Sequence, residues 1–177
     1  MTRFALWLLT GLLLALGVHV GTLLAVPYLA AQKPPGWLRP LGPDFVFVAA
    51  PQGLTLREDP ALRLSVCRYD LNAAPVRVRV QTTDGFTSVA VYTPDGRNQY
   101  ALNDRAAQRG MMEFTLYSPA QLADVRAREG PDTPESLRVG VADGAGLIVV
   151  RALVPHPSEE PAVLAALGQA TCESVPR

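Results

Sequence analysis

The stretch from Phe86 to Asn103, FTSVAVYTPDGRNQYALN, carries the clearest turn signal in the chain. Residues 86–93 are rich in the residue types that favour strands, and residues 97–103 are their expected partner across a turn. Between them, Pro94-Asp95-Gly96 supplies turn chemistry: Pro presets its φ angle, Asp bonds to nearby backbone, and Gly tolerates a positive φ. The stretch therefore predicts a β-hairpin.

More strands are predicted on both sides of this hairpin. Apolar and polar residues alternate in three segments, 76–80, 112–117 and 137–141, as expected of strands with one solvated face. The run 147–154 is apolar on both faces at its start, which favours a central strand.

Two helices are expected among these strands. Ser118, followed by Pro119, is a typical start for a helix over 119–125. A second helix opens at Ser158 with Glu159, Glu160 and Pro161. Its expected apolar face carries Val163, Leu164, Leu167 and Ala170. The predicted fold class is α+β: six or seven antiparallel strands in one sheet or a sandwich, with two covering helices.

Composition restricts the classes of protein that fit. The chain has 177 residues, 49% of them hydrophobic and 18% charged, with a formal net charge of zero. This composition argues against a disordered chain and against a nucleic-acid binder that uses a large basic surface. The length suits one domain with an appendage.

The N-terminal segment is expected to cross a membrane. From Phe4 to Leu29 the sequence has 26 residues without a formal charge. As a helix this run would reach about 39 Å, more than the roughly 30 Å hydrocarbon core. A cleavable signal peptide is the alternative, but its apolar stretch would be shorter and would end at an A-x-A-like site. We therefore expect an uncleaved anchor over residues 1–32, embedded in the lipid bilayer.

The anchor is followed by a Pro/Gly-rich connector, residues 33–43, and then by the β-rich domain, residues 44–177. Arg3 lies on one side of the membrane segment, and Lys33 and Arg39 lie on the other, so the positive-inside rule weakly opposes a cytoplasmic N-terminus. Long domains translocate largely regardless of charge, however. We predict a single-pass bacterial inner-membrane protein with a cytoplasmic N-terminus and a periplasmic C-terminal domain.

Three residues in the anchor suggest contacts with another helix. Gly17 and Gly21 form a small-xxx-small pair, which allows close approach of two membrane helices, although glycine is common in such helices. His19 lies between them. An intramembrane ionisable group is a functional hypothesis by default, but a neutral His bonded to a carbonyl, to Thr22 or to a partner helix is the simpler interpretation.

Cys67 and Cys172 are the two cysteines in the chain. A bond between them would close a loop of about 105 residues and would join the helix ending near Cys172 to the start of the sheet. Two unrelated buried thiols are the alternative. A domain placed outside the membrane favours the disulfide.

Several segments together resemble small membrane-anchored members of the bacterial domain of unknown function 1254 family. They are CRYDL (67–71), SVAVYTPDGRNQYALNDR (88–105), LIVVRALVP (147–155) before a helix ending in Cys172, and a His-bearing N-terminal helix. In larger relatives this domain is joined to the domain of unknown function 1214. The resemblance implies an anchored partner protein of the latter family, and it implies no reaction.

The sequence offers little catalytic chemistry. It contains no G-x-S-x-G, P-loop, G-x-G-x-x-G or H-E-x-x-H motif, and its His and Cys residues do not suggest a zinc site. We therefore assign no catalytic residue, metal ligand or cofactor, and we expect no nucleic-acid partner.

One polar cluster could form a binding site. If the end of the hairpin folds back on CRYDL, one pocket would gather Arg68, Tyr69, Asp70, Tyr92, Tyr100, Asn103, Asp104 and Arg105. Such a pocket could bind a carboxylate or a sugar. The alternative is a structural role, with turn capping and backbone hydrogen bonds, and we favour it.

These observations lead to two hypotheses. The first is an interaction or assembly subunit of an envelope complex. The second is an envelope enzyme or small-molecule binder that uses the Arg/Asp/Tyr cluster. Proton relay through His19 is the weakest reading, because one helix cannot enclose a path.

Overall fold

The structure is a computed structural model that describes residues 2–30, 42–50, 59–128 and 136–176. The chain divides into two compact units between Pro34 and Pro35. The predicted connector, residues 33–43, lies outside the described residues as far as Leu41.

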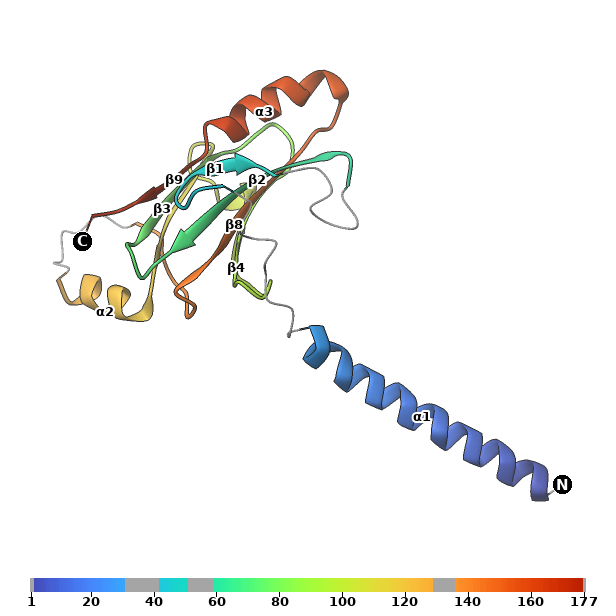
Figure 1. The fold of residues 1–177 in the computed structure, drawn as a ribbon. Coiled ribbons are helices and arrows are strands. Elements are labelled where there is room, and N and C mark those ends of the chain that lie inside the picture. The colour runs from blue at the N-terminus through green and yellow to red at the C-terminus, as the bar shows by residue number, and fades with distance from the viewer. Residues whose placement is uncertain (1, 31–41, 51–58, 129–135, 177) are drawn as a thin grey trace. The chain divides into compact units, whose positions relative to one another are not determined.

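The first unit is the helix α1, Thr2–Ala30 (Figure 1). Its span Thr2–Leu29 is long and apolar enough to cross a membrane, and its large apolar side chains are exposed. The Thr22 hydroxyl donates to the Val18 carbonyl at 2.8 Å, which satisfies the hydroxyl within the helix. Thr22 was one of the partners considered for His19; its hydroxyl donates to the backbone here, and its oxygen can still accept a hydrogen bond.

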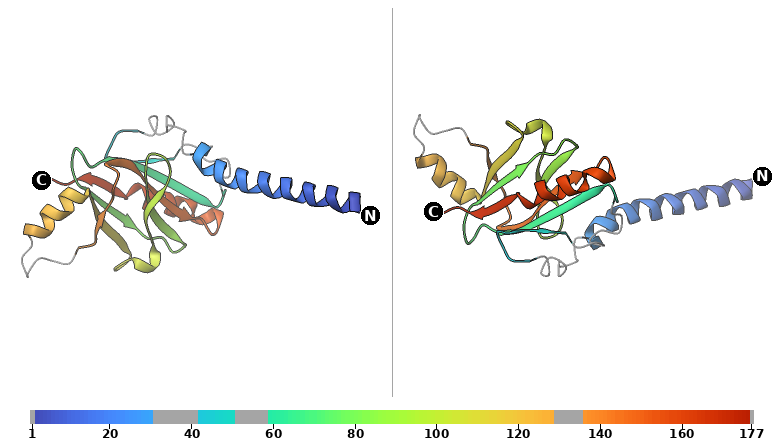
Figure 2. Two further views of the ribbon diagram at one scale, coloured as in Figure 1. Left: turned by 90° about the horizontal axis from the view of Figure 1, so that it is seen from below. Right: turned by 90° about the horizontal axis from the view of Figure 1, so that it is seen from above.

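The second unit is a sandwich of two sheets (Figures 1 and 2). In order across the five-stranded sheet, the strands are β1 (Phe47–Ala49), β2 (Leu62–Asp70), β8 (Ala145–Leu153), β4 (Thr87–Tyr92) and β5 (Asn98–Asn103). The four-stranded sheet has β7 (Arg138–Gly140), β6 (Met111–Tyr117), β3 (Val76–Gln81) and β9 (Thr171–Ser174). The described strands confirm the expected α+β class.

Alternation along the strands builds the core between the sheets. In β3, the inward side chains of Val76, Val78 and Val80 are buried, and the intervening Arg77 and Arg79 are not. The same core cluster includes β6, β4 and β8 residues. Strand β8 pairs with β2 on one side and β4 on the other, and it also buries Leu147 and Val149 in a second cluster on its opposite face. The predicted central strand is therefore confirmed.

Helix α2, Pro119–Arg128, connects β6 to the parallel strand β7. Its N-terminus is a capping box. Ser118 Oγ accepts from the Gln121 backbone N–H at 3.3 Å, and Gln121 Oε1 accepts from the Ser118 N–H at 2.8 Å. Because parallel neighbours need a crossover connection, this helix lies over the sheet edge that it links. Its Leu122 lies against Gly140 of β7.

Helix α3, Glu160–Gly168, contacts β2 and β8 of one sheet and β3 of the other. A 3-10 turn, η3 (Pro157–Glu159), precedes it, so the α-helix begins at Glu160 and not at the predicted Ser158. Val163, Leu167 and the following Ala170 are buried as expected. Leu164 is 48% exposed, because a short helix that packs on one side of the sandwich buries only a narrow stripe.

Three further expectations need correction. The described residues contain nine strands, not six or seven, and the β6–β7 pair is parallel. The additional strands β1 and β9 have three and four residues, too few to show an alternating pattern. Cys172 lies in β9 and not at a helix end.

Candidate functional site

The two cysteines form a disulfide that joins the two sheets. Cys67 lies in β2 opposite Ile148, and Cys172 lies in β9 opposite Val78. Their Cα atoms are 6.6 Å apart, and both side chains are buried. The predicted pairing is therefore present, but it connects sheet to sheet instead of sheet to helix.

The eight residues of the predicted polar cluster do not share one pocket. Strands β2 and β5 are separated by β8 and β4 in the sheet order. At about 4.8 Å per strand, the CRYDL segment and the far strand of the hairpin lie roughly 14 Å apart. Several of these side chains have local partners in the backbone or in neighbouring side chains.

The β2 residues of the cluster support neighbouring backbone and side chains. Arg68 forms an ion pair with Asp44 at 3.0 Å and donates to the Gly42 carbonyl at 3.3 Å. Asp70 Oδ1 accepts from the Asn72 backbone N–H at 2.9 Å, which is a turn cap.

Three tyrosines of the cluster have different surroundings. Tyr69 is 2% exposed, and burial, followed by the nearby Asp143 carboxylate, raises its pKa to about 12. Burial also raises the pKa of Tyr100, which meets Phe114 edge-to-face with ring centroids 5.8 Å apart. Tyr92 accepts a hydrogen bond from Arg151 Nη2 at 2.8 Å on the hydroxyl oxygen. Tyr69 is therefore a core side chain, and the partly buried Tyr100 packs against the core.

The remaining cluster residues end the hairpin. Asn103 caps a 3-10 turn, η2 (Asp104–Ala106), and its side chain accepts from the Arg105 backbone N–H at 3.2 Å. Asp104 and Arg105 form the turn itself. The cap is therefore Asn103, whereas the sequence suggested turn capping by Asp104 and Arg105.

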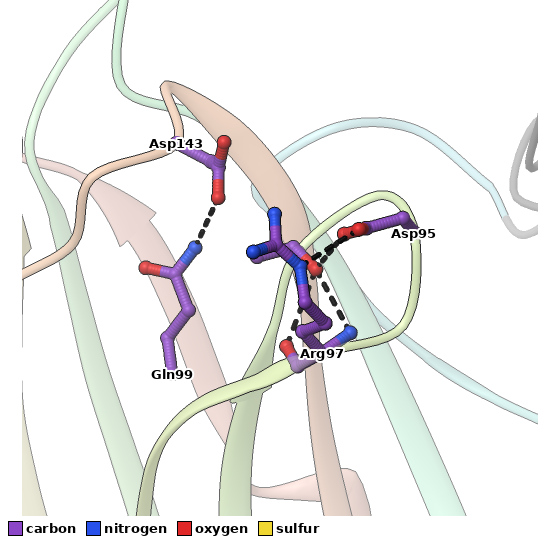
Figure 3. A network of polar contacts seen from close by, with 5 residues as sticks. Asp95, Arg97, Gln99 and Asp143 are labelled. Carbon is purple, nitrogen blue, oxygen red and sulfur yellow. Dashed lines mark hydrogen bonds and ion pairs between the residues drawn. The ribbon is translucent and has the colours of Figure 1, made fainter. Parts of the chain in front are cut away.

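The predicted hairpin turn carries a polar network of its own (Figure 3). Arg97 Nε donates to Asp95 Oδ2 at 2.7 Å, and the buried Thr93 hydroxyl also donates to Asp95. The hydrogen bond from Thr93, and then those from Arg97, hold the pKa of Asp95 below its ordinary range. Gln99 donates to Asp143 at 2.7 Å and so ties the hairpin to the loop before β8.

A groove of about 800 Å³ lies on the four-stranded sheet, beside α2 and the segment that follows η2. Its charged lining residues are four arginines and one glutamate: Arg77, Arg109, Arg128, Arg138 and Glu113. None of these residues was expected to form a site from the sequence alone. The one relevant signal in the sequence was the alternation in 76–80, which predicted that the arginines of this strand lie on its solvated face.

Comparisons with known proteins show the fold and not the function. No family model matches the chain, and no curated protein matches it. The VPA0106 protein from Vibrio parahaemolyticus has a similar structure, with a TM-score of 0.58 and 13% identity over 79% of this chain and 32% of that one. An uncharacterised protein from Burkholderia cenocepacia gives a TM-score of 0.48 and 16% identity over 73% of this chain and 34% of that one. The chain thus spans about a third of the length of these two proteins.

Proposed function

We propose that this protein is a single-pass bacterial inner-membrane protein whose periplasmic domain is an interaction or assembly subunit of an envelope complex. The observation that carries the proposal is the presence, in one chain, of an apolar helix of membrane-spanning length and a disulfide-linked β domain. Disulfides persist in oxidising compartments, including the bacterial periplasm. With the domain outside, the short N-terminal end of α1 lies in the cytoplasm.

Two observations favour an interaction role over an independent activity. The fold that makes up most of this chain corresponds to about a third of a longer chain in the Vibrio protein. A domain that occurs beside other parts in a longer chain is a good candidate for binding a separate partner. In addition, the family resemblance suggests an anchored protein of the domain of unknown function 1214 family as that partner.

Helix α1 supplies a surface for such a partner. A side chain added at Gly17 or Gly21 would meet no described atom within 4 Å, so this strip is open to another helix. His19 is two residues from each glycine, which places it about 200° around the helix from Gly17 and therefore on the side opposite the strip. We propose that the Gly17–Gly21 strip contacts the partner's membrane helix.

The double substitution Gly17→Leu/Gly21→Leu should separate the partner while leaving the anchor intact. Membrane helix contacts of this kind contribute about 1 kcal/mol, so we expect roughly a fivefold loss of the co-purified partner. The measurement is affinity purification of the full chain from its native membranes in a mild detergent, with quantitative mass spectrometry. Gly11→Leu is the matched control, since Gly11 is also open but lies on another face of the helix. A chain that purifies alone in every detergent would contradict the interaction role.

A further inference from the structure

The register of three neighbouring strands places two arginines and a threonine side by side in the arginine-lined groove. Thr115 of β6 lies opposite Arg77 of β3 on one side and opposite Arg138 of β7 on the other. Directly opposed residues on neighbouring strands share one face of the sheet, with Cβ atoms about 5 Å apart. The three residues therefore form one row, with the hydroxyl between two arginines, and all three line the groove.

The groove is positively charged although the chain as a whole is neutral. Among the described residues, its lining has four arginines and one glutamate, which gives a formal charge of +3, whereas the whole chain has 16 basic and 16 acidic residues. One of the four arginines, Arg128, forms an ion pair with Asp124 at 2.8 Å, outside this lining. The carboxylate among the described lining residues, Glu113, is 3.1 Å from Arg79 and 3.9 Å from Arg77, so its closer ion pair is with Arg79 and not with the groove residue Arg77. A concave surface with an excess of one sign of charge concentrates ions of the opposite sign.

The Thr115 side chain supplies an independent indication of a ligand. Thr115 is 7% exposed, and within the described part of the chain its hydroxyl has no hydrogen-bond partner. Buried hydroxyls are nearly always hydrogen-bonded, because an unpaired one loses its contacts with water without replacement. A polar group of this kind, at the floor of a groove and between two guanidinium-bearing residues, is suited to an acceptor oxygen from outside the chain.

We propose that this groove binds a phosphate group, with Arg77 and Arg138 on either side and the Thr115 hydroxyl donating to a third oxygen. Arginine guanidinium groups make charge-assisted, often bidentate hydrogen bonds to phosphate. Arg77, Thr115 and Arg138 offer hydrogen-bond donors from three neighbouring strands. Such a row fits the several acceptor oxygens of a phosphate better than it fits the two oxygens of a carboxylate. The volume of about 800 Å³ is in the range of sites for small organic ligands.

The proposal is tested with the full-length oxidised protein in neutral detergent micelles. Glycerol 3-phosphate and inorganic phosphate are titrated at constant ionic strength, and binding is measured by calorimetry. We expect saturable binding that weakens at least about tenfold in Arg77→Gln and in Thr115→Val. Arg97→Gln is the matched control: Arg97 is an exposed arginine on the hairpin of the other sheet, and its loss should leave binding unchanged.

A second arm distinguishes a soluble phosphate ester from a lipid headgroup. The protein is placed in nanodiscs of phosphatidylcholine alone or with phosphatidylglycerol, and the glycerol 3-phosphate titration is repeated. Equal affinity for glycerol 3-phosphate in both kinds of nanodisc assigns the site to a soluble phosphate ester. Weaker binding of glycerol 3-phosphate in the phosphatidylglycerol nanodiscs alone shows competition by the lipid and assigns the site to a lipid headgroup.

The absence of saturable binding in every arm would overturn the proposal, as would binding that Arg77→Gln and Thr115→Val leave unchanged. If Arg77→Gln lowers the melting temperature, the nearly isosteric Thr115→Val decides the question alone. The inference does not depend on the membrane anchor or on a protein partner, so its failure would leave the proposed function standing.

Discussion

Replacing both cysteines with alanine should lower the free energy of unfolding of the β domain by about 4 kcal/mol. The bond closes a loop between residues 105 apart in sequence, and the stabilisation from a cross-link grows with the length of the loop that it closes. Cys67→Ala/Cys172→Ala also removes a covalent link between two sheets, which would then be held by side-chain contacts and connecting loops alone.

The measurement is urea-induced unfolding of the full chain in micelles, followed by circular dichroism at the β-sheet band. Reductant should lower the stability of the wild-type protein by a similar amount and leave the double variant unchanged. A loss below about 1 kcal/mol in both experiments would show that the disulfide contributes little to the fold.

Gly146→Ala is expected to be the most disruptive single-methyl change in the described part of the chain. Gly146 lies in the central strand β8 opposite Tyr69 of β2. A Cβ atom at this position would lie 2.6 Å from the Tyr69 hydroxyl and even closer to the Tyr92 carbonyl oxygen. The first group is buried and the second is backbone, so neither can move away cheaply. We expect a loss of about 3 kcal/mol or more in the free energy of unfolding.

Gly168→Ala provides the matched control for this substitution. A Cβ atom at Gly168, the last residue of α3, meets nothing within 4 Å. The same chemical change should therefore leave stability unchanged or raise it slightly, by up to about 1 kcal/mol. Equal effects of the two substitutions in urea unfolding would mean that the close approach at Gly146 is not present in the protein.

Much of the fold could be predicted because its signals are local. The turn residues Pro94-Asp95-Gly96 join β4 and β5 into a hairpin, and the side chain of Ser118 caps the N-terminus of α2. The apolar faces of residues 147–150 indicate the central position of β8. The disulfide could be predicted because the chain offers only one pairing.

The sheet order could not be predicted, and the polar cluster depended on it. Strand β8 lies between β2 and β4, although it follows both of them in sequence by more than 50 residues. That long-range pairing separates the CRYDL segment from β5. The arginine-lined groove was missed for the same reason: Arg77, Arg109, Arg128 and Arg138 come from separate segments, and only the β3–β6–β7 register brings two of them beside Thr115.

The most direct test of the membrane-anchored, periplasmic assignment is the thiol state of Cys67 and Cys172 in native membranes. Because both side chains are buried, free thiols are trapped by denaturing the membranes rapidly in detergent with a mass-tagged maleimide, with or without prior reduction. We expect no tag without reductant and two tags on a single chain after reduction, in the membrane fraction. Two tags without reductant would contradict both the link between the sheets and the oxidising compartment.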